Sequence, residues 1–307
     1  MIPIITIEGA TASGKSTLAI QLAKLINAQI ISADSRQVYR YLDIGTAKVS
    51  IEEQQQVHHH LINLIDPDAS YNAGAFCTDA SAIIAQLHEN NIIPIVCGGT
   101  GLYVKSLLQG LFTLPDLPIY LRLELKERLN NEGLNSLYNQ LQSLDPAFAS
   151  NISANDSQRV LRGLEIVLGT GMPISEHWRM QQAQPRYHAF RILVDIPRPL
   201  LYSRINERIH SMLASGLLEE IHGLFNRGFT PLCPGLNSLG YKEFIPYFVS
   251  GANLEECTNL AAQHTRNYAK RQCTWYRKTT FDLTISTFPL RLSEVMHKIE
   301  EVFSRGV

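Results

Sequence analysis

Eight residues near the amino terminus have the types and the spacing that hold phosphate groups. They read GATASGKS and fit the pattern GxxxxGK[ST], whose glycines let backbone N–H groups point into one concavity. The lysine reaches an outer phosphate and the next hydroxyl suits a Mg²⁺ ion. ATP- and other nucleotide-binding proteins share the pattern, which predicts a diphosphate or polyphosphate with a metal. The residues predicted to bind it, with Ser16 as metal ligand, are Gly9, Ala10, Thr11, Ala12, Ser13, Gly14, Lys15 and Ser16.

A carboxylate follows the next predicted strand. Residues 28–32 (AQIIS) predict a short strand, and Asp34 comes directly after it. Ligands of open α/β sheets bind beyond the carboxyl ends of the strands, so we expect Asp34 near the loop of residues 9–16. Aspartate also caps helices well, which is the structural alternative. We favour a functional role over helix capping, because a carboxylate is not expected beside a phosphate site unless it serves the function of that site.

The elements that position these groups alternate between strands and helices. Apolar stripes predict helices at 17–26, where Leu18, Leu22 and Leu25 recur, and at 71–87, 157–168 and 200–213. Short apolar or β-branched runs predict strands at 4–7, 28–32, 92–97 and 190–196. The run at 92–97 is almost continuously apolar, as a parallel sheet covered on both faces requires. We therefore predict an α/β fold, a P-loop NTPase-like parallel sheet flanked by helices.

The pattern changes after Leu114. Pro115 and Pro118 break the chain, and a polar, helical stretch follows in which Asp145-Pro146 predicts a helix start. We interpret this stretch as an all-helical insertion between two strands. The predicted domains are a core of residues 1–114 and 189–307 and an insertion of residues 115–188.

Three groups of basic residues are candidate phosphate contacts. Arg204 and Arg208 share one face of a predicted helix, and their spacing does not rank them. Arg159 and Arg162 lie off the apolar face of theirs. Residues 264–278 (HTRNYAKRQCTWYRK) interleave basic and aromatic side chains, which suits a nucleic-acid strand, although a solvated helix face is the alternative.

Other conspicuous residues favour structural roles. The three histidines at 58–60 cannot all face one metal from regular structure, so we expect a surface or loop-packing role. Asp195 ends the only hhhD-like strand, and a plain strand end is the preferred interpretation. The turn GGTGLY at 98–103 predicts backbone close to a ligand. The five cysteines include no CxxC pair, so neither a disulfide framework nor a zinc site is indicated.

Composition sets broad limits. The 307 residues carry a formal net charge of −1, so a nucleic-acid surface must come from local clustering. No leader pattern and no run of about 18 apolar residues is present, so we expect no membrane partner and a cytoplasmic location. We also expect a monomer.

Motifs along almost the whole chain resemble the bacterial tRNA dimethylallyltransferases, also called tRNA isopentenyltransferases. Two positions depart from the family pattern, Ala10 where proline is usual and Met172 where lysine is common, and neither touches a group that we assign to chemistry. The matching stretches are GATASGKS (9–16), DSRQVYRYLDIGTAK (34–48), HHHLIN (58–63), GGTGLY (98–103), DSQRVLRGLEI (156–166), GMPISE (171–176), GLNSLGYKE (235–243) and TRNYAKRQCTWYRK (265–278).

The resemblance implies a reaction. The dimethylallyl group of dimethylallyl diphosphate would pass to N6 of the adenosine just 3′ of the anticodon in tRNA, so the 9–16 loop would hold a leaving diphosphate with Mg²⁺. Asp34 would be the base, with Thr11, Lys15 and Arg208 at the diphosphate. The tRNA contacts that it implies, on the anticodon stem-loop, are Asp34, Ser35, Arg36, Gln37, Thr100, Arg122, Gln158, Arg159, Val160, Leu161 and Arg162.

Two other functions share parts of this pattern. A small-molecule kinase would need an acceptor for the γ-phosphate of ATP and an arginine-rich lid, for which the insertion could be mistaken. A nucleotide-switched RNA-binding module would bind GTP or ATP tightly without turnover. The poor Walker B strand disfavours the kinase, and Asp34 at a strand end favours catalysis over a switch.

Overall fold

The computed structural model describes residues 1–110, 117–180, 186–286 and 292–304, and the chain divides into two compact units. The first unit comprises Met1–Gln109 and Pro185–Val307, and the second comprises Gly110–Gln184. The predicted boundaries fall instead after residues 114 and 188. One reason is that the strand predicted from residue 190 begins at Tyr187. The predicted break at Leu114 and Pro115 lies outside the described residues.

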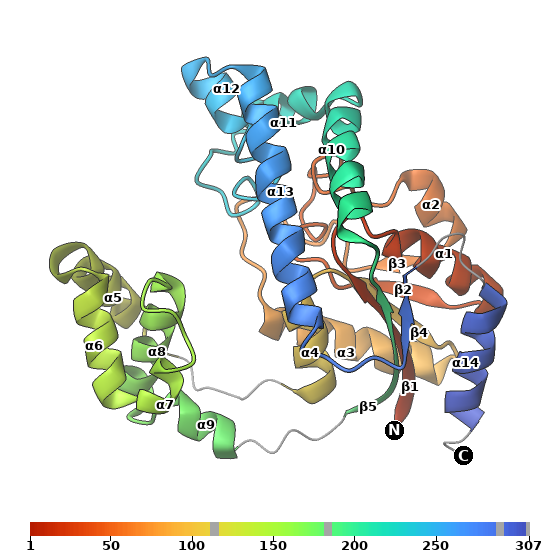
Figure 1. Cartoon of the computed structure of the whole chain (residues 1–307), viewed down its shortest axis with the longest axis horizontal. Helices are drawn as coiled ribbons and strands as arrows, with labels where there is room; N and C mark the ends of the chain where they lie inside the picture. Colours follow the sequence, from red (N-terminus) through yellow and green to blue (C-terminus); the bar gives the residue numbers. More distant parts are fainter. Residues whose placement is uncertain (111–116, 181–185, 287–291, 305–307) are drawn as a thin grey trace. The chain divides into compact units, whose positions relative to one another are not determined.

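A parallel sheet forms the centre of the first unit (Figure 1). The described strands form one six-stranded sheet of order β3-β2-β4-β1-β5-β6, in which every neighbouring pair is parallel. The predicted strands are therefore confirmed, with shifted ends. Their bounds are β1 Ile2–Gly9, β2 Gln29–Ser32, β3 His59–His60, β4 Pro94–Gly98, β5 Tyr187–Val194 and β6 Leu283–Ile285.

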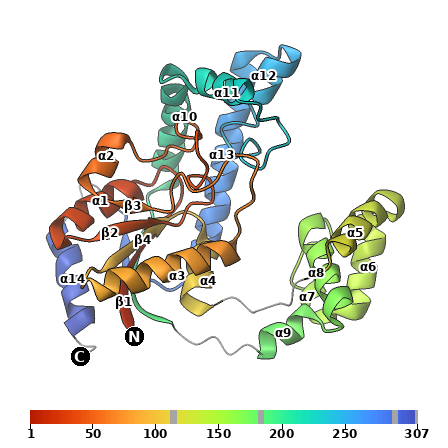
Figure 2. The same cartoon turned by 180° about the vertical axis from the view of Figure 1, so that it is seen from behind.

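Helices cover both faces of the sheet (Figure 2). Alternation along β1 sends Ile5 and Ile7 into a core with α1, α10 and α14, and sends Ile4 into a core with α3 and α4. The bounds of the helices in this unit are α1 Lys15–Ile26, α2 Ile51–Gln56, α3 Ala73–Glu89, α4 Gly101–Gln109, α10 Arg198–Ala214, α11 Leu217–Asn226, α12 Ile245–Ser250, α13 Leu254–Tyr276 and α14 Leu292–Ser304.

Three details differ from the sequence-based expectations. Leu25 is exposed, because α1 buries the side of Leu18 and Leu22 and leaves the end of the predicted stripe in solvent. The helix expected from residue 71 begins at Ala73, because the Asn72 side chain accepts hydrogen bonds from two N–H groups of its first turn. The turn at 98–103 leads into α4, a helix that we did not predict.

A third hydrophobic cluster lies beyond the sheet. It joins α10, α11 and α13 to the loop after β2, and its fully buried members include Leu42, Leu217, Tyr241 and Phe244. The stretch at 235–244, which includes the motif GLNSLGYKE, is a series of turns that supplies Tyr241 and Phe244 before α12 begins. This cluster anchors the loop after β2 to α10, α11 and α13.

The second unit is helical throughout its described elements, as predicted. Leu137, Leu141, Val160 and Leu164 form much of its core. Asp145 caps the predicted helix start, since its Oδ1 accepts the N–H of Phe148 at 3.0 Å. The bounds are α5 Ile119–Glu132, α6 Leu134–Leu144, α7 Pro146–Ala149, α8 Ser157–Thr170 and α9 Ile174–Met180. In neither unit is any described helix both long and apolar enough to span a membrane.

Candidate active site

The loop of residues 9–16 joins β1 to α1 and presents backbone N–H groups. Ala12 and Gly14 have φ angles of 61° and 98°, the left-handed values that build such a concavity. No side chain caps the first turn of α1, so its N–H groups are available to an anion. Lys15 folds back, and its Nζ donates to the Ala10 carbonyl at 3.2 Å. Burial lowers the pKa of the Lys15 ammonium, and the charge of Asp34 opposes that shift.

Two arginines of α10 reach this loop. Arg208 Nη1 donates to Thr11 Oγ1 at 3.4 Å, and Arg204 Nη1 donates to the Ser13 carbonyl at 3.3 Å. Burial lowers the pKa of the Arg208 guanidinium, and the charge of Asp34 raises it. The helix therefore directs two cations at the phosphate-type loop. Arg208 lines two hollows together with Asp34, whereas Arg204 lines one of them.

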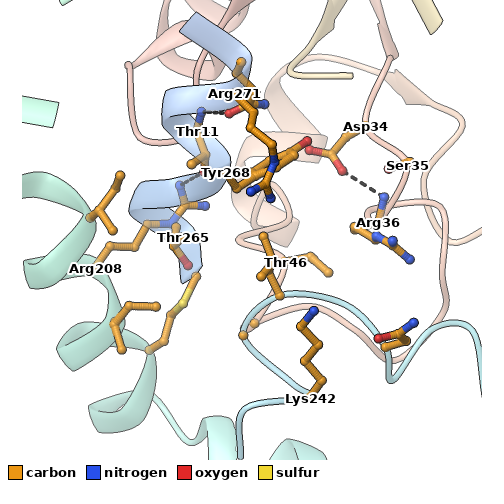
Figure 3. A pocket seen from close by; sticks show the side chains of 18 of the residues that line it. Thr11, Asp34, Ser35, Arg36, Thr46, Arg208, Lys242, Thr265, Tyr268 and Arg271 are labelled. Atoms are coloured by element: carbon orange, nitrogen blue, oxygen red, sulfur yellow. Dashed lines mark hydrogen bonds between the residues drawn. The ribbon is translucent and has the colours of Figure 1, made fainter. Parts of the chain in front are cut away.

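Asp34 lies at the carboxyl end of β2, in a turn and not at a helix start. Its Oδ1 accepts the backbone N–H of Arg36 at 2.8 Å, and the residues that follow form turns. The helix-capping alternative is therefore wrong. In Figure 3 the carboxylate and the ring of Tyr268 from α13 point toward one another. A carboxylate so placed is able to accept a proton from a ligand beside it.

The ends of β2 and β4 are tied together behind Asp34. Thr100 Oγ1 accepts the N–H of Ser35 at 3.1 Å, and its own N–H donates to the Ala33 carbonyl at 3.2 Å. A Cβ at Gly98 would overlap that carbonyl, so the close approach requires glycine. The predicted Gly-rich turn thus fixes the segment that carries Asp34.

Gln272 on α13 is a residue that we did not single out. Its Oε1 accepts the Thr11 N–H at 2.9 Å and its Nε2 donates to the Gly99 carbonyl at 2.7 Å. The residue is only 7% exposed, so both ends of its amide are used inside the protein. It connects the 9–16 loop to the turn after β4. Its place within the conspicuous stretch at 265–278 was the only signal for it.

Tyr268, one of the aromatic residues in the stretch at 264–278, lines the same hollow as Asp34. Burial raises the pKa of its phenol to about 12, and the charge of Asp34 adds to that shift. The phenol is therefore protonated at neutral pH. It offers an aromatic face and a hydroxyl next to the carboxylate.

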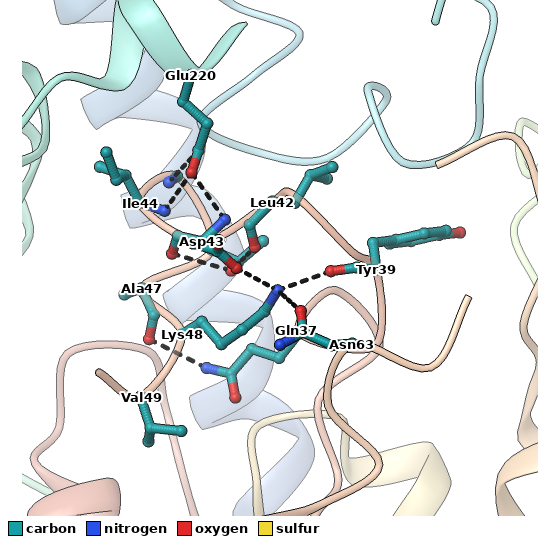
Figure 4. Close-up of polar contacts among 12 residues, drawn as sticks. Gln37, Tyr39, Leu42, Asp43, Ile44, Ala47, Lys48, Val49, Asn63 and Glu220 are labelled. Carbon is teal, nitrogen blue, oxygen red and sulfur yellow. Dashed lines mark hydrogen bonds and ion pairs between the residues drawn. The ribbon is translucent and has the colours of Figure 1, made fainter. Parts of the chain in front are cut away.

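The loop of residues 41–48 is held by the charged side chains of Glu220 and Lys48 (Figure 4). Glu220 of α11 accepts the N–H groups of Asp43, Ile44 and Gly45 at 2.8–3.2 Å. It also accepts the Tyr241 hydroxyl at 2.6 Å. These contacts hold Thr46, the next residue, at the edge of the site.

Lys48 ties the same loop from its other end. Its Nζ donates to the Tyr39 carbonyl at 2.7 Å and to side-chain oxygens of Asp43 and Asn63 at 2.6 Å. Burial lowers the pKa of the Lys48 ammonium, and the hydrogen bond to Asp43 opposes that shift. The loop therefore has a defined shape before any ligand binds.

Two adjoining hollows result from this arrangement. The first, of about 370 Å³, runs along the 9–16 loop and includes Gly14 and Ser16. The second, of about 310 Å³, has aromatic, apolar and basic walls. The residues that line both are Thr11, Lys15, Asp34, Thr46 and Arg208. The groups we assigned to chemistry therefore meet where the two hollows join.

The predicted tRNA contacts fall in both units. In the first, Ser35 and Arg36 line the second hollow, whereas the Gln37 amide donates to the Ala47 carbonyl at 3.1 Å and is engaged internally. In the second, Val160 is fully buried, so a contact there stays a prediction for its backbone alone. Gln158, Arg159, Arg162 and Arg122 are exposed or partly exposed, and Leu161 packs partly against the core.

The remaining candidates lie elsewhere. Asp195 follows β5 and lines a separate hollow with Arg198 and Cys273. His59 and His60 form the edge strand β3, where His60 Nε2 lies 2.7 Å from Gln29 Oε1. Burial, followed by repulsion from His58 and His59, lowers the pKa of His60 to about 4. The histidines have the packing role that we expected.

The first hollow suits a metal that is held mainly by a ligand's own oxygens. Ser16 is exposed there, with Lys15 and Asp34 in the same lining. Within the described ranges no three His, Cys, Asp or Glu side chains gather to hold a metal. Mg²⁺ at phosphates takes few protein ligands, so this donor set fits it.

Fold and site together define an α/β protein with a phosphate-type loop at the carboxyl edge of a parallel sheet. A family model described as IPP transferase matches residues 37–279. The chain is 41% identical over 276 residues to tRNA dimethylallyltransferase of Geobacter sulfurreducens, covering 90% of this chain and 89% of that protein. It is 38% identical over 304 residues to the Roseiflexus castenholzii enzyme of that name, covering 98% and 97%.

Solved structures agree. A tRNA isopentenylpyrophosphate transferase from Staphylococcus epidermidis matches with a TM-score of 0.71 and 36% identity, over 99% of this chain and 100% of that one. A eukaryotic dimethylallyltransferase acting on tRNA matches with a TM-score of 0.85 and 30% identity, over 100% and 80%. The chain belongs to the IPP transferase family. The predicted resemblance is confirmed, and it favours prenyl transfer over the kinase and the switch.

Proposed function

We propose that the protein transfers the dimethylallyl group of dimethylallyl diphosphate to N6 of the adenosine just 3′ of the anticodon in tRNA, releasing diphosphate. The observation that carries the proposal is the pair of adjoining hollows, with Asp34, Thr11 and Arg208 at their junction. A diphosphate in the first hollow and an adenine in the second would meet at these residues. Family membership supports the same reaction.

The first hollow suits the diphosphate. Uncapped N–H groups of α1, Lys15, Arg204 and Arg208 would bind its charge and stabilise the additional negative charge of the leaving group. Ser16 would be the protein ligand of a Mg²⁺ ion. When bound, that ion would neutralise charge on the diphosphate oxygens. Thr11, whose hydroxyl accepts a hydrogen bond from Arg208, would contact the bridging oxygen that leaves.

The second hollow suits the acceptor and the prenyl tail. Ile205, Ile209 and Met212 give it an apolar wall that would cover the allylic carbons and exclude water. Tyr268 gives it an aromatic wall for the adenine. A stacked adenosine cannot enter such a hollow, so the base would be flipped out of the anticodon loop.

Asp34 would act as the base. The lone pair of N6 is delocalised into the purine, so the amine is a weak nucleophile. N6 forms a bond to C1 of the prenyl group, the C1–O bond breaks, and diphosphate leaves with that electron pair. The proton of N6 passes to the Asp34 carboxylate, whose Oδ1 is oriented by the Arg36 N–H. Charge and atoms balance in this step.

A single-turnover assay tests the proposal. Purified protein, Mg²⁺, radiolabelled dimethylallyl diphosphate and bulk tRNA are mixed, with ATP added to a parallel tube. We expect label in tRNA without ATP. Consumption of ATP without transfer of label would contradict the proposal and would favour the alternative function, a small-molecule kinase. The tRNA substrate supports a cytoplasmic location, whereas the monomer stays a prediction.

A further inference from the structure

A further hollow adjoins the active site along the loop of residues 41–48. It has a volume of about 570 Å³, and we call it the 43–51 hollow. Its apolar lining residues are Ile44, Ala47, Val49, Ile51 and Met212. Among the described residues, Arg208 and Met212 alone line both this hollow and the second hollow of the active site. These two side chains of α10 therefore stand where the two hollows meet.

Met212 and the loop form the wall between the two hollows. Gly45 and Thr46 line the second hollow. Their neighbours Ile44 and Ala47 line the 43–51 hollow. Met212 is 8% exposed and belongs to the hydrophobic cluster against which Ile44 and Ala47 pack. One apolar side chain thus completes a wall whose other part is a backbone turn.

The loop part of this wall is fixed in place. Glu220 accepts three of the loop's backbone N–H groups, and Lys48 donates to the Tyr39 carbonyl and the Asn63 side chain. Met212 is an unbranched thioether, which fills an irregular gap by packing alone. Shortening this side chain would therefore join the two hollows while the hydrogen bonds of the loop stay in place.

The position of Met212 along α10 matches the end of a five-carbon tail. C1 of the donor would lie near Arg208, where the first and second hollows join. Met212 is four residues further on, about 6 Å along the helix axis, and Ile209 covers the interval. A dimethylallyl group extends three carbon–carbon bonds from C1, less than about 4.5 Å. A geranyl group extends seven, up to about 10 Å, and would have to pass Met212.

We propose that Met212 sets the length of the prenyl donor by closing the second hollow against the 43–51 hollow. This rests on the proposed function and assigns to it a residue that determines specificity. Transfer of a longer group makes and breaks the same bonds. N6 bonds to C1, the C1–O bond breaks, diphosphate leaves with the electron pair, and the N6 proton passes to Asp34. Only the space for the tail differs.

Replacing Met212 by a smaller residue tests the proposal. The kcat/KM values for dimethylallyl diphosphate and for geranyl diphosphate are measured with the same tRNA. We expect the wild-type enzyme to prefer the five-carbon donor. Met212→Ala should reduce that preference about tenfold to two-hundredfold, because the added carbons gain an apolar space that the wild-type side chain denies them. Met212→Leu conserves the volume and should keep the preference.

Leu213→Ala is the matched control. Leu213 packs against the same hydrophobic cluster but lines neither hollow, so its truncation loosens the packing without joining the hollows. We expect this variant to keep the wild-type preference. Thermal unfolding reports whether each variant folds. Met212→Val removes less of the side chain and takes the place of Met212→Ala if the alanine variant does not fold.

Three results would overturn the proposal. The first is a folded Met212→Ala or Met212→Val enzyme with the wild-type preference. The second is a wild-type enzyme that uses both donors equally well. The third is an equal change of preference in Leu213→Ala, which would assign the effect to loosened packing. A wild-type enzyme that transfers neither donor to tRNA would instead contradict the proposed function.

Discussion

The arginines beside the 9–16 loop and those of the helical unit are held in opposite ways. Arg208 is partly buried and donates to Thr11 within the loop that it serves. In the helical unit Arg159 and Arg162 are 64% and 44% exposed and form ion pairs with carboxylates of their own helix, Asp156 and Glu165. Arg122, 60% exposed, shares Glu165.

This difference separates two kinds of anion binding. A buried cation has already lost its hydration and is fixed, so it serves a small, highly charged ligand whose atoms must be placed accurately. The exposed Arg159–Asp156 pair contributes about 0.2–1 kcal/mol, so a polyanion displaces its carboxylate at little cost. The first region is suited to chemistry and the second to capture of a long, variable substrate.

The largest effect is expected at Asp34. Asp34→Asn keeps an oxygen for the Arg36 N–H but removes the base, so turnover should fall roughly 10²–10⁴-fold while the Kd for tRNA stays within about threefold. Single-turnover transfer and tRNA binding are measured in parallel. Asp195→Asn, at another strand end and in another hollow, is the control. Equal losses in turnover and tRNA binding would exclude the role of base.

The next effect ranks two arginines that their spacing left equal. Arg208→Gln should lower kcat/KM for the donor about 10²–10³-fold, because it removes a charge at the junction of the hollows. Arg204→Gln should cost less, since Arg204 donates to a loop carbonyl and lines only the first hollow of the two. Steady-state kinetics and inhibition by inorganic diphosphate measure both. Identical losses would mean that Arg208 has no special place.

A stability effect is expected at Glu220. Glu220→Gln replaces one carboxylate oxygen by an NH₂ group that faces backbone donors, so we expect a loss of about 2 kcal/mol in the free energy of unfolding. Denaturant titration measures it. Glu219→Gln changes the exposed neighbour and should be neutral. An unchanged stability would show that the 41–48 loop does not depend on this carboxylate.

Local patterns explain which parts of the site were predictable. The 9–16 loop and Asp34 follow from a motif and from the rule that ligands lie beyond strand ends. The roles of Gln272 and Glu220 do not follow from any local pattern, because their hydrogen-bond partners are far away in the sequence. Gln272 is 261 residues from Thr11, and Glu220 is 175 residues from Gly45. Nothing in the spacing of Arg204 and Arg208 distinguishes them, since their difference arises from which loop atom each one reaches. Contacts that arise only from tertiary packing could therefore not be predicted from the sequence.

The smallest effects are expected in the helical unit. Arg159→Ala and Arg162→Ala should each weaken tRNA binding a few-fold and reduce the salt slope by about 1, with the KM for dimethylallyl diphosphate unchanged. Titration of tRNA at several salt concentrations measures this. Arg128→Ala is the control in the same unit, because Arg128 pairs with Glu132 and was not predicted to contact tRNA. A loss confined to the donor KM would contradict the division between the two regions.

Glu165 sharpens this last test. It is 7% exposed and holds both Arg122 and Arg162, so it competes with any phosphate for two cations. Glu165→Gln removes that competition, and we expect tRNA binding to tighten a few-fold at low salt because the cations are released from a charged partner. Weaker binding would mean that the carboxylate orients the arginines for tRNA. In that case the helical unit would be preorganised like the 9–16 loop, and the contrast between them would disappear.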